Sequence, residues 1–145
     1  DISKYHHYMP SSRNHQVANY PQKYGYLYLI PCKYGYADLV KIGRSSGYTE
    51  EAMHEECEKR CSSWRKTATG VIVNKERLGN ACFYSQNDAL YHEQKLHELL
   101  ANYNVPIINN KTRGYHKEFF NYNNDVIVLI NEYLHNNDVT LQDPP

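Results

Sequence analysis

A positively charged side chain falls on the apolar face of a predicted helix. The helix over residues 49–66 has an apolar stripe made of Met53, Cys57 and Trp64. On a wheel of roughly 100° per residue, Arg60 falls inside this stripe. A guanidinium keeps its charge, so an inward Arg60 needs an anionic partner or a water-filled cleft. The alternative is that its stem covers Trp64 while its head reaches solvent.

A second predicted helix, over residues 85–102, also has polar side chains on its apolar face. Its apolar stripe contains Leu96 and Leu100, and Glu93 and His97 fall inside it. Two helices that present unlike charged groups inward predict a shared polar pocket. A carboxylate that holds a divalent metal and an arginine that neutralises phosphate are what phosphodiester hydrolysis needs. A direct structural ion pair between the two charged groups is the alternative.

Basic residues gather near this predicted pocket. The net charge is zero, but residues 1–77 hold twelve lysines and arginines against eight acidic residues. Basic side chains interspersed with serines and threonines attract phosphate backbones, although a solvated helix end has the same composition. The candidate nucleic-acid-binding residues are Arg44, Lys59, Arg65, Lys66, Lys75 and Arg77.

The elements that must position these groups follow the order β-β-α-β-α-(β)-α. Residues 25–31 and 39–43 read as a hairpin, and residues 69–77 as a third strand. A final helix is predicted over residues 123–137. This order predicts an α+β fold around a small, mostly antiparallel sheet.

Capping residues delimit the three predicted helices. Thr49 caps the first helix. Ser85, followed three residues later by Asp88, forms a start like a capping box for the second. Asn124 or Asp125 caps the third.

The length of 145 residues predicts one domain. We expect an irregular N-terminal arm over residues 1–22, the domain over 23–138 and a tail over 139–145. The chain begins at Asp1 rather than at a methionine, as a processed or trimmed product would. Sparse cysteines and the lack of a membrane-length apolar run predict an intracellular protein of the nucleus or cytoplasm without a membrane partner. Secretion and the oligomeric state are left open.

A zinc site is a competing hypothesis for the first helix. His54, Cys57 and Cys61 share one helical face, as metal ligands would. Small core cysteines beside a surface histidine are the alternative. The remaining ligand would be Cys32, Cys82 or His116.

Several short motifs, taken in order, resemble a known family. They are "YLYLI", "VKIGR", the arginine in "KRCSSW", the glutamate in "YHEQKLHELL", and "HKEFF". Together they resemble the GIY-YIG endonuclease superfamily, most closely its KIG-type branch of phage and fungal meiotic proteins. The likeness covers roughly residues 24–135.

The resemblance implies a three-stranded antiparallel sheet flanked by helices, one Mg²⁺ or Mn²⁺ ion, and DNA as substrate, with RNA not excluded. It implies that Tyr28 positions or deprotonates the attacking water. Arg60 would bind the scissile phosphate and Glu93 would ligate the metal. His97 and His116 are accessory candidates at the phosphate or the metal.

The chain departs from the family pattern at several places, of which two bear on the proposed chemistry. Lys41 stands where the second motif has a tyrosine, and Gly43 is that motif's glycine. The lysine could lower the pKa of Tyr28 by its charge, or bind phosphate. The stretch between Gly43 and Arg60 is long and acidic. A module that binds nucleic acid or a protein partner without cutting is therefore the rival to a metal-dependent endonuclease.

Overall fold

The computed structural model describes residues 23–74, 79–83 and 85–142. The predicted N-terminal arm, part of the predicted third strand and the end of the tail lie outside these ranges. None of the helices in the described part combines the length and the apolar character needed to cross a membrane.

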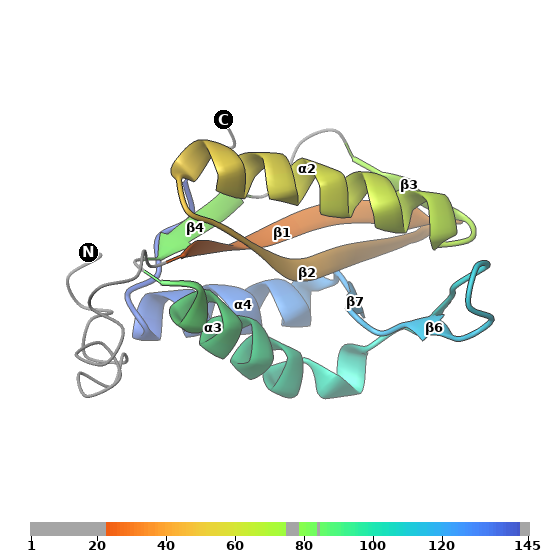
Figure 1. Ribbon diagram of the computed structural model, residues 1–145. Helices are drawn as coiled ribbons and strands as arrows, with labels where there is room; N and C mark the ends of the chain where they lie inside the picture. Colours follow the sequence, from red (N-terminus) through yellow and green to blue (C-terminus); the bar gives the residue numbers. More distant parts are fainter. Residues whose placement is uncertain (1–22, 75–78, 84, 143–145) are drawn as a thin grey trace.

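The described residues form three layers, with an antiparallel sheet as the middle layer. Helix α2 (Glu50–Thr67) covers one face, whereas α3 (Gln86–Leu99) and α4 (Asn124–Asn136) cover the other (Figure 1). A short 3₁₀ turn, η2 (Ala101–Tyr103), follows α3. This architecture confirms the predicted α+β class with a small antiparallel sheet flanked by helices.

A long hairpin forms the centre of the sheet. Strands β1 (Tyr24–Tyr34) and β2 (Ala37–Gly47) pair antiparallel along their whole lengths. The two-residue turn between them contains Gly35 at a φ of 61°, a conformation that glycine adopts without steric cost. The sequence predicted this hairpin but placed it over shorter strands.

Shorter strands extend the hairpin on both sides. Strands β3 (Val71–Val73) and β4 (Gly79–Phe83) both pair with β1, and β7 (Phe119–Asn121) pairs with β2. Among the described residues the main sheet therefore has five strands, which extends the three expected. Strands β5 (Ile107–Ile108) and β6 (Tyr115–His116) form a separate pair.

Two of the three predicted helix caps differ in detail from the structure. The Thr49 hydroxyl accepts a hydrogen bond from the backbone N–H three residues on, which confirms its capping role. Ser85 occupies the N-cap position of α3, but its side chain makes no capping hydrogen bond, so the predicted capping box is wrong. The cap of α4 is Asn123 rather than Asn124 or Asp125. Asn123 precedes the first helical turn and is the residue with the extended backbone that a cap requires.

Side-chain alternation along β1 divides the core into two. Tyr26 and Tyr28 belong to the cluster beneath α2, and Leu27 and Leu29 belong to the cluster beneath α3 and α4. Each cluster buries its large side chains almost completely. The tyrosine hydroxyls therefore lie on the α2 face of the sheet.

Helix α3 begins in direct contact with the backbone of β1. A β-carbon at Gly25 would lie 2.6 Å from the Cα of Gln86. The absence of a side chain at Gly25 lets the helix pack closely on the strand. This contact fixes the start of the helix that carries Glu93 and His97.

Candidate active site

The outer edge of β2 changes partner at Ile42. Pairing with β7 spans Leu39 to Lys41, after which the Ile42 amide donates to the Glu118 carbonyl at 3.1 Å. His97 Nε2 lies 2.9 Å from the Ile42 carbonyl oxygen. Because a carbonyl only accepts hydrogen bonds, Nε2 carries the proton. The Ile42 backbone thus holds α3 and the segment before β7 at one point.

Three side chains with metal-ligating atoms meet beside this point. One such atom from each of Glu93, His97 and Glu118 lies within 4.8 Å of the other two. Glu93 and His97 share a face of α3 because they are four residues apart. Ligands on opposite sides of a Mg²⁺ ion lie about 4 Å apart, since each is about 2 Å from it. The cluster is close to the size that a divalent ion requires. Its two carboxylates suit Mg²⁺ or Mn²⁺, and its imidazole is a ligand that transition metals accept.

The Glu93 carboxyl group is buried among charged neighbours. Burial is the main reason that its pKa rises to about 7, and the Glu118 charge raises it further. The positive charges of Arg44, Lys41 and Arg60 oppose this shift. Arg44 Nε lies 3.6 Å from Glu93 Oε1. The prediction that Glu93 lies on the inner face of α3 is confirmed. Its burial there makes it a carboxyl group that titrates near neutral pH.

Lys41 is a buried cation directly behind Glu118. Its side chain is 4% exposed and its Nζ lies 2.5 Å from Glu118 Oε1. The same Nζ lies over the rings of Trp64 and Phe119, at 5.6 and 5.4 Å from their centroids. An ion pair and two aromatic faces stabilise this buried charge. Lys41 is therefore placed to hold Glu118 in position and to neutralise it.

Tyr28 lies on the α2 side of the same strands, against Gly43. A β-carbon at Gly43 would overlap the Tyr28 ring and hydroxyl. Burial, followed by the nearby Cys61 and Cys57, raises the pKa of Tyr28. The idea that Lys41 lowers this pKa is wrong, because the lysine pairs with Glu118 instead. Tyr28 is a phenol at neutral pH, able to donate or accept a hydrogen bond but not poised as a base.

The predicted inward orientation of Arg60 is wrong. Its side chain is 43% exposed, and its Nε donates to Glu56 Oε1 at 3.1 Å, one helical turn earlier. The long stem carries the charged head to solvent, which was the alternative expectation. Its positive charge still lowers the pKa of Glu93 and of Tyr28. Arg60 is thus a solvated cation near the candidate site rather than a buried one, and Arg44 is the guanidinium paired with Glu93.

Comparison with protein-family models identifies the family. Residues 25–132, which include the whole cluster, match the T5orf172 domain. The chain belongs to the T5orf172 domain family. This family is nuclease-related, of the GIY-YIG or HNH-like kind. Comparisons with curated proteins and with solved structures find no match.

The other basic residues expected to bind nucleic acid lie along α2 of the T5orf172 domain or outside the described residues. Lys59, Arg65 and Lys66 are exposed on α2. The Arg65 Nε donates to the Cys61 carbonyl oxygen, which orients that side chain along the helix. Lys75 and Arg77 lie outside the described ranges.

His116 does not join the cluster of Glu93, His97 and Glu118. Its Nε2 lies 2.9 Å from the Thr67 hydroxyl, and its ring meets Phe119 edge-on. Burial and the Lys41 charge lower its pKa. These contacts assign His116 to the junction between α2 and β6.

The zinc hypothesis for α2 is wrong in the part of the chain that the structure describes. His54 bonds the Tyr26 hydroxyl through Nδ1, at 3.2 Å. Cys57 and Cys61 form no disulfide and are buried in the core beneath α2. Among the described residues, the group that could hold a metal is the one on α3 and the segment before β7.

Glu118 is the residue of the site that sequence reasoning missed. It lies in "HKEFF", whose two phenylalanines are buried in opposite cores. No spacing relates it to Glu93, because the two meet only through the pairing of β2 with β7. The single signal was that this acidic residue lies within a motif already matched to the family.

Lys41→Met is expected to raise the pKa of Glu93 further above its ordinary value. The substitution removes one cation that lowers this pKa and leaves the Glu118 charge without its partner. An NMR titration of ¹³C-labelled carboxyl groups measures the shift. Lys33→Met is the matched control, since it removes the same charge from an exposed pair with Asp38 on the hairpin. An unchanged pKa of Glu93 in Lys41→Met would contradict this account.

Proposed function

We propose that this T5orf172 domain is a metal-dependent endonuclease of the GIY-YIG type, KIG branch, that hydrolyses DNA phosphodiester bonds with one divalent ion. The observation that carries the proposal is the convergence of Glu93, His97 and Glu118 within 4.8 Å. Metal-assisted hydrolysis of phosphodiesters needs such a ligand set beside positive charge.

Glu93, His97 and Glu118 would hold Mg²⁺ or Mn²⁺. When bound, the ion would polarise a phosphoryl oxygen and lower the pKa of a water molecule. Glu93 has to lose its proton to serve as a ligand, which its pKa of about 7 permits at neutral pH. Lys41 orients the Glu118 carboxylate through their ion pair.

Arg44 and Arg60 would bind the phosphate. Both are cations whose charge acts on Glu93, and both are at least partly exposed. A DNA phosphate can exchange with Glu56 as the partner of Arg60, because an exposed ion pair contributes little stability. The Tyr28 phenol would orient a water molecule by hydrogen bonding, since its raised pKa argues against a role as base.

Cleavage of supercoiled DNA tests the proposal. With Mg²⁺ or Mn²⁺ we expect nicked circles to accumulate. EDTA should abolish nicking, and excess Mn²⁺ should restore it. Gel electrophoresis measures the nicked fraction, and RNA of the same sequence in a parallel assay measures the preference between the nucleic acids. Undiminished nicking in EDTA would contradict a metal-dependent mechanism.

A domain that binds nucleic acid or a protein partner without cutting is the second candidate. The observation that favours it is the internal neutralisation of the site, where Arg44 faces Glu93 and Lys41 faces Glu118. DNA retention in a gel-shift assay, with intact DNA at every metal concentration, would support this candidate over the nuclease.

A further inference from the structure

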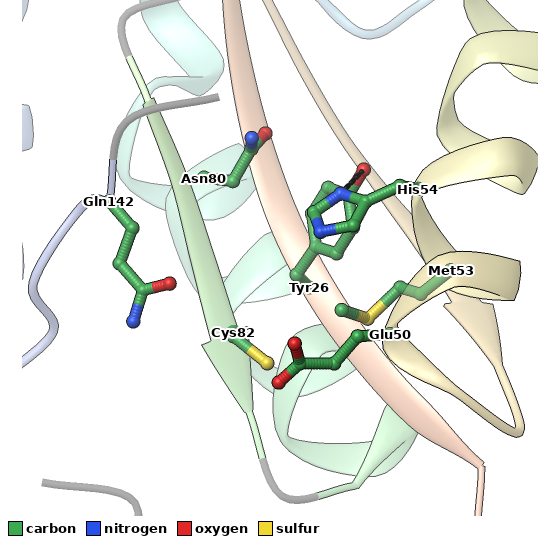
Figure 2. Close-up of a pocket in the computed structure, with 7 residues that line it drawn as sticks. All are labelled: Tyr26, Glu50, Met53, His54, Asn80, Cys82 and Gln142. Carbon is green, nitrogen blue, oxygen red and sulfur yellow. Dashed lines mark hydrogen bonds between the residues drawn. The ribbon is translucent and has the colours of Figure 1, made fainter. Parts of the chain in front are cut away.

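A second polar pocket lies on the α2 face of the sheet, on the β4 side of the hairpin. It has a volume of about 90 Å³. Asn80 and Cys82 project into it from β4, and residues of α2 face them across Tyr26 (Figure 2). One water molecule needs roughly 10–15 Å³ by the same measure. The pocket therefore has room for a group of several heavy atoms. Its described lining is Tyr26, Glu50, Met53, His54, Asn80, Cys82 and Gln142.

The Asn80 amide has no hydrogen-bond partner among the described residues. Asn80 is 4% exposed, and both its Nδ2 and its Oδ1 lack a partner. Burying an amide without hydrogen bonds destabilises a fold, and such groups in native proteins call for an explanation. In Figure 2 the Asn80 side chain lies at the edge of the pocket, between Gln142 and Tyr26. A ligand that offers both an acceptor and a donor would satisfy it.

The charge of the pocket excludes an anionic ligand. Among the described lining residues there is no lysine or arginine, and Glu50 places its carboxylate beside the Cys82 thiol (Figure 2). Burial and the Glu50 charge both raise the pKa of that thiol, as expected at a negative potential. Phosphate would be repelled, whereas a neutral group with N–H donors would be attracted.

The half-buried His54 ring adds a surface for a planar group, and the fully buried Tyr26 ring packs against it. Their centroids are 5.1 Å apart, and the tyrosine hydroxyl and His54 Nδ1 share a hydrogen bond. This bond fixes the half-buried His54 ring at the pocket. Met53 contributes an adaptable apolar contact.

We infer that this pocket binds a nucleobase that carries an exocyclic amino group. Asparagine pairs with the adjacent acceptor and amino donor of such a base, and a glutamate carboxylate accepts from an amino group. Thymine lacks the amino group, so Glu50 discriminates against it. The ligand is a free nucleoside or a base turned out of a strand, and both present the same edge. Both this inference and the proposed function concern nucleic acid, but they rest on different residues. Glu93, His97 and Glu118 do not line this pocket.

Methyl NMR of the full chain in EDTA tests the inference. The sequence has two methionines, Met9 and Met53, and Met53 lines the pocket. Protein labelled with ¹³C at the methionine methyls is titrated with deoxycytidine, deoxyadenosine and thymidine. We expect the Met53 signal to shift with the first two nucleosides and at least roughly tenfold more weakly with thymidine. Oligo-dC and oligo-dT then distinguish the two sources, since a shift by oligo-dC alone assigns the ligand to a strand.

Three variants sharpen the test. Asn80→Leu should lose the shift without a fall in melting temperature, because it removes an unsatisfied amide. Glu50→Gln, at an exposed position, should reduce the preference over thymidine and cannot fail through misfolding. Asn87→Leu, at an exposed position on α3, is the control and should bind as wild type.

The outcomes separate this inference from the nuclease proposal. Nucleoside binding should persist in Glu93→Ala, so a chain that fails to nick DNA can still bind at the pocket. No Met53 shift with any nucleoside or oligonucleotide would overturn the inference. A shift that survives Asn80→Leu would overturn it as well. A shift caused only by arginine- or lysine-bearing peptides would assign the pocket to a protein partner instead.

Discussion

Glu93→Gln is expected to reduce DNA nicking by roughly 10²–10³-fold or more, while making the metal-free protein more stable. The amide keeps the shape of the side chain but cannot serve as an anionic ligand. The stability gain follows from burial, which holds the pKa of the carboxyl group at about 7 against an ordinary value of 4.5. This difference corresponds to roughly 3 kcal/mol, an upper limit because the ion pair with Arg44 is also lost.

The direction in which stability changes with pH distinguishes a specific loss of the Glu93 carboxylate from a general disruption of the fold. The folded state holds the Glu93 proton more tightly than the unfolded state, so wild-type stability is complete below about pH 4.5 and falls as pH rises to about 7. The stability difference between Glu93→Gln and wild type should therefore widen from pH 5 to pH 8 in urea denaturation. Nicking by wild type should rise over the same range, because ionised Glu93 is needed. A higher metal concentration should move that midpoint to lower pH.

Glu98→Gln is the matched control for this variant. Glu98 lies on the same helix, with a side chain that is 71% exposed and a pairing to Lys95. Its nicking rate and its pH-dependent stability should equal those of wild type. Full nicking activity in Glu93→Gln would remove Glu93 from the reaction and the nuclease proposal with it.

Gly43→Ala is expected to slow nicking by roughly 10²-fold and to destabilise the fold by about 1–3 kcal/mol. The added methyl group would occupy the position of the Tyr28 ring, which is 2% exposed and cannot move aside into solvent. Either β1 and β2 separate locally or the phenol leaves its place beside the site. Nicking rates and urea midpoints measure the two effects.

Two further variants interpret the Gly43 result. Gly114→Ala is the control, since its β-carbon would meet the Thr112 hydroxyl at 3.5 Å, an ordinary contact. Adding Tyr28→Leu to Gly43→Ala should recover part of the stability but not the activity. Wild-type behaviour of Gly43→Ala would mean that the strand accommodates the methyl group and that the position of Tyr28 is unimportant.

The periodicity of the helices predicted Glu93 correctly and Arg60 incorrectly, for one physical reason. A glutamate on an apolar stripe is too short to reach solvent, so its position on the wheel decides its surroundings. An arginine has a long stem, and the pairing with Glu56 adds a local reason to turn outward. Helical phase therefore locates short polar side chains better than long ones.

Glu118 and the pairing of Lys41 could not be predicted because they depend on contacts between distant segments. Lys41 and Glu118 are separated by 77 positions in the sequence, and no periodic signal relates the two. The hairpin, the three helices and the α+β class follow from local pattern, and the structure confirms them. The pocket around Asn80 could not be predicted either, because β4 joins β1 through long-range pairing.

The Ile42 backbone has a consequence for mutational scanning and for the evolution of the domain. Its amide and its carbonyl hold the segment before β7 and helix α3, which together supply all three candidate ligand side chains. The Ile42 side chain fills the core beneath α3 and α4. Any apolar residue of similar size should serve there, so substitution tables would rate the position as tolerant. Inserting or deleting one residue in β2 before Ile42 would instead turn the side chains that follow to the opposite face of the sheet. It would also move the Ile42 backbone away from α3 and from the segment before β7. The domain should therefore tolerate replacement of Ile42 by another apolar residue, but not an insertion or deletion in β2 before it.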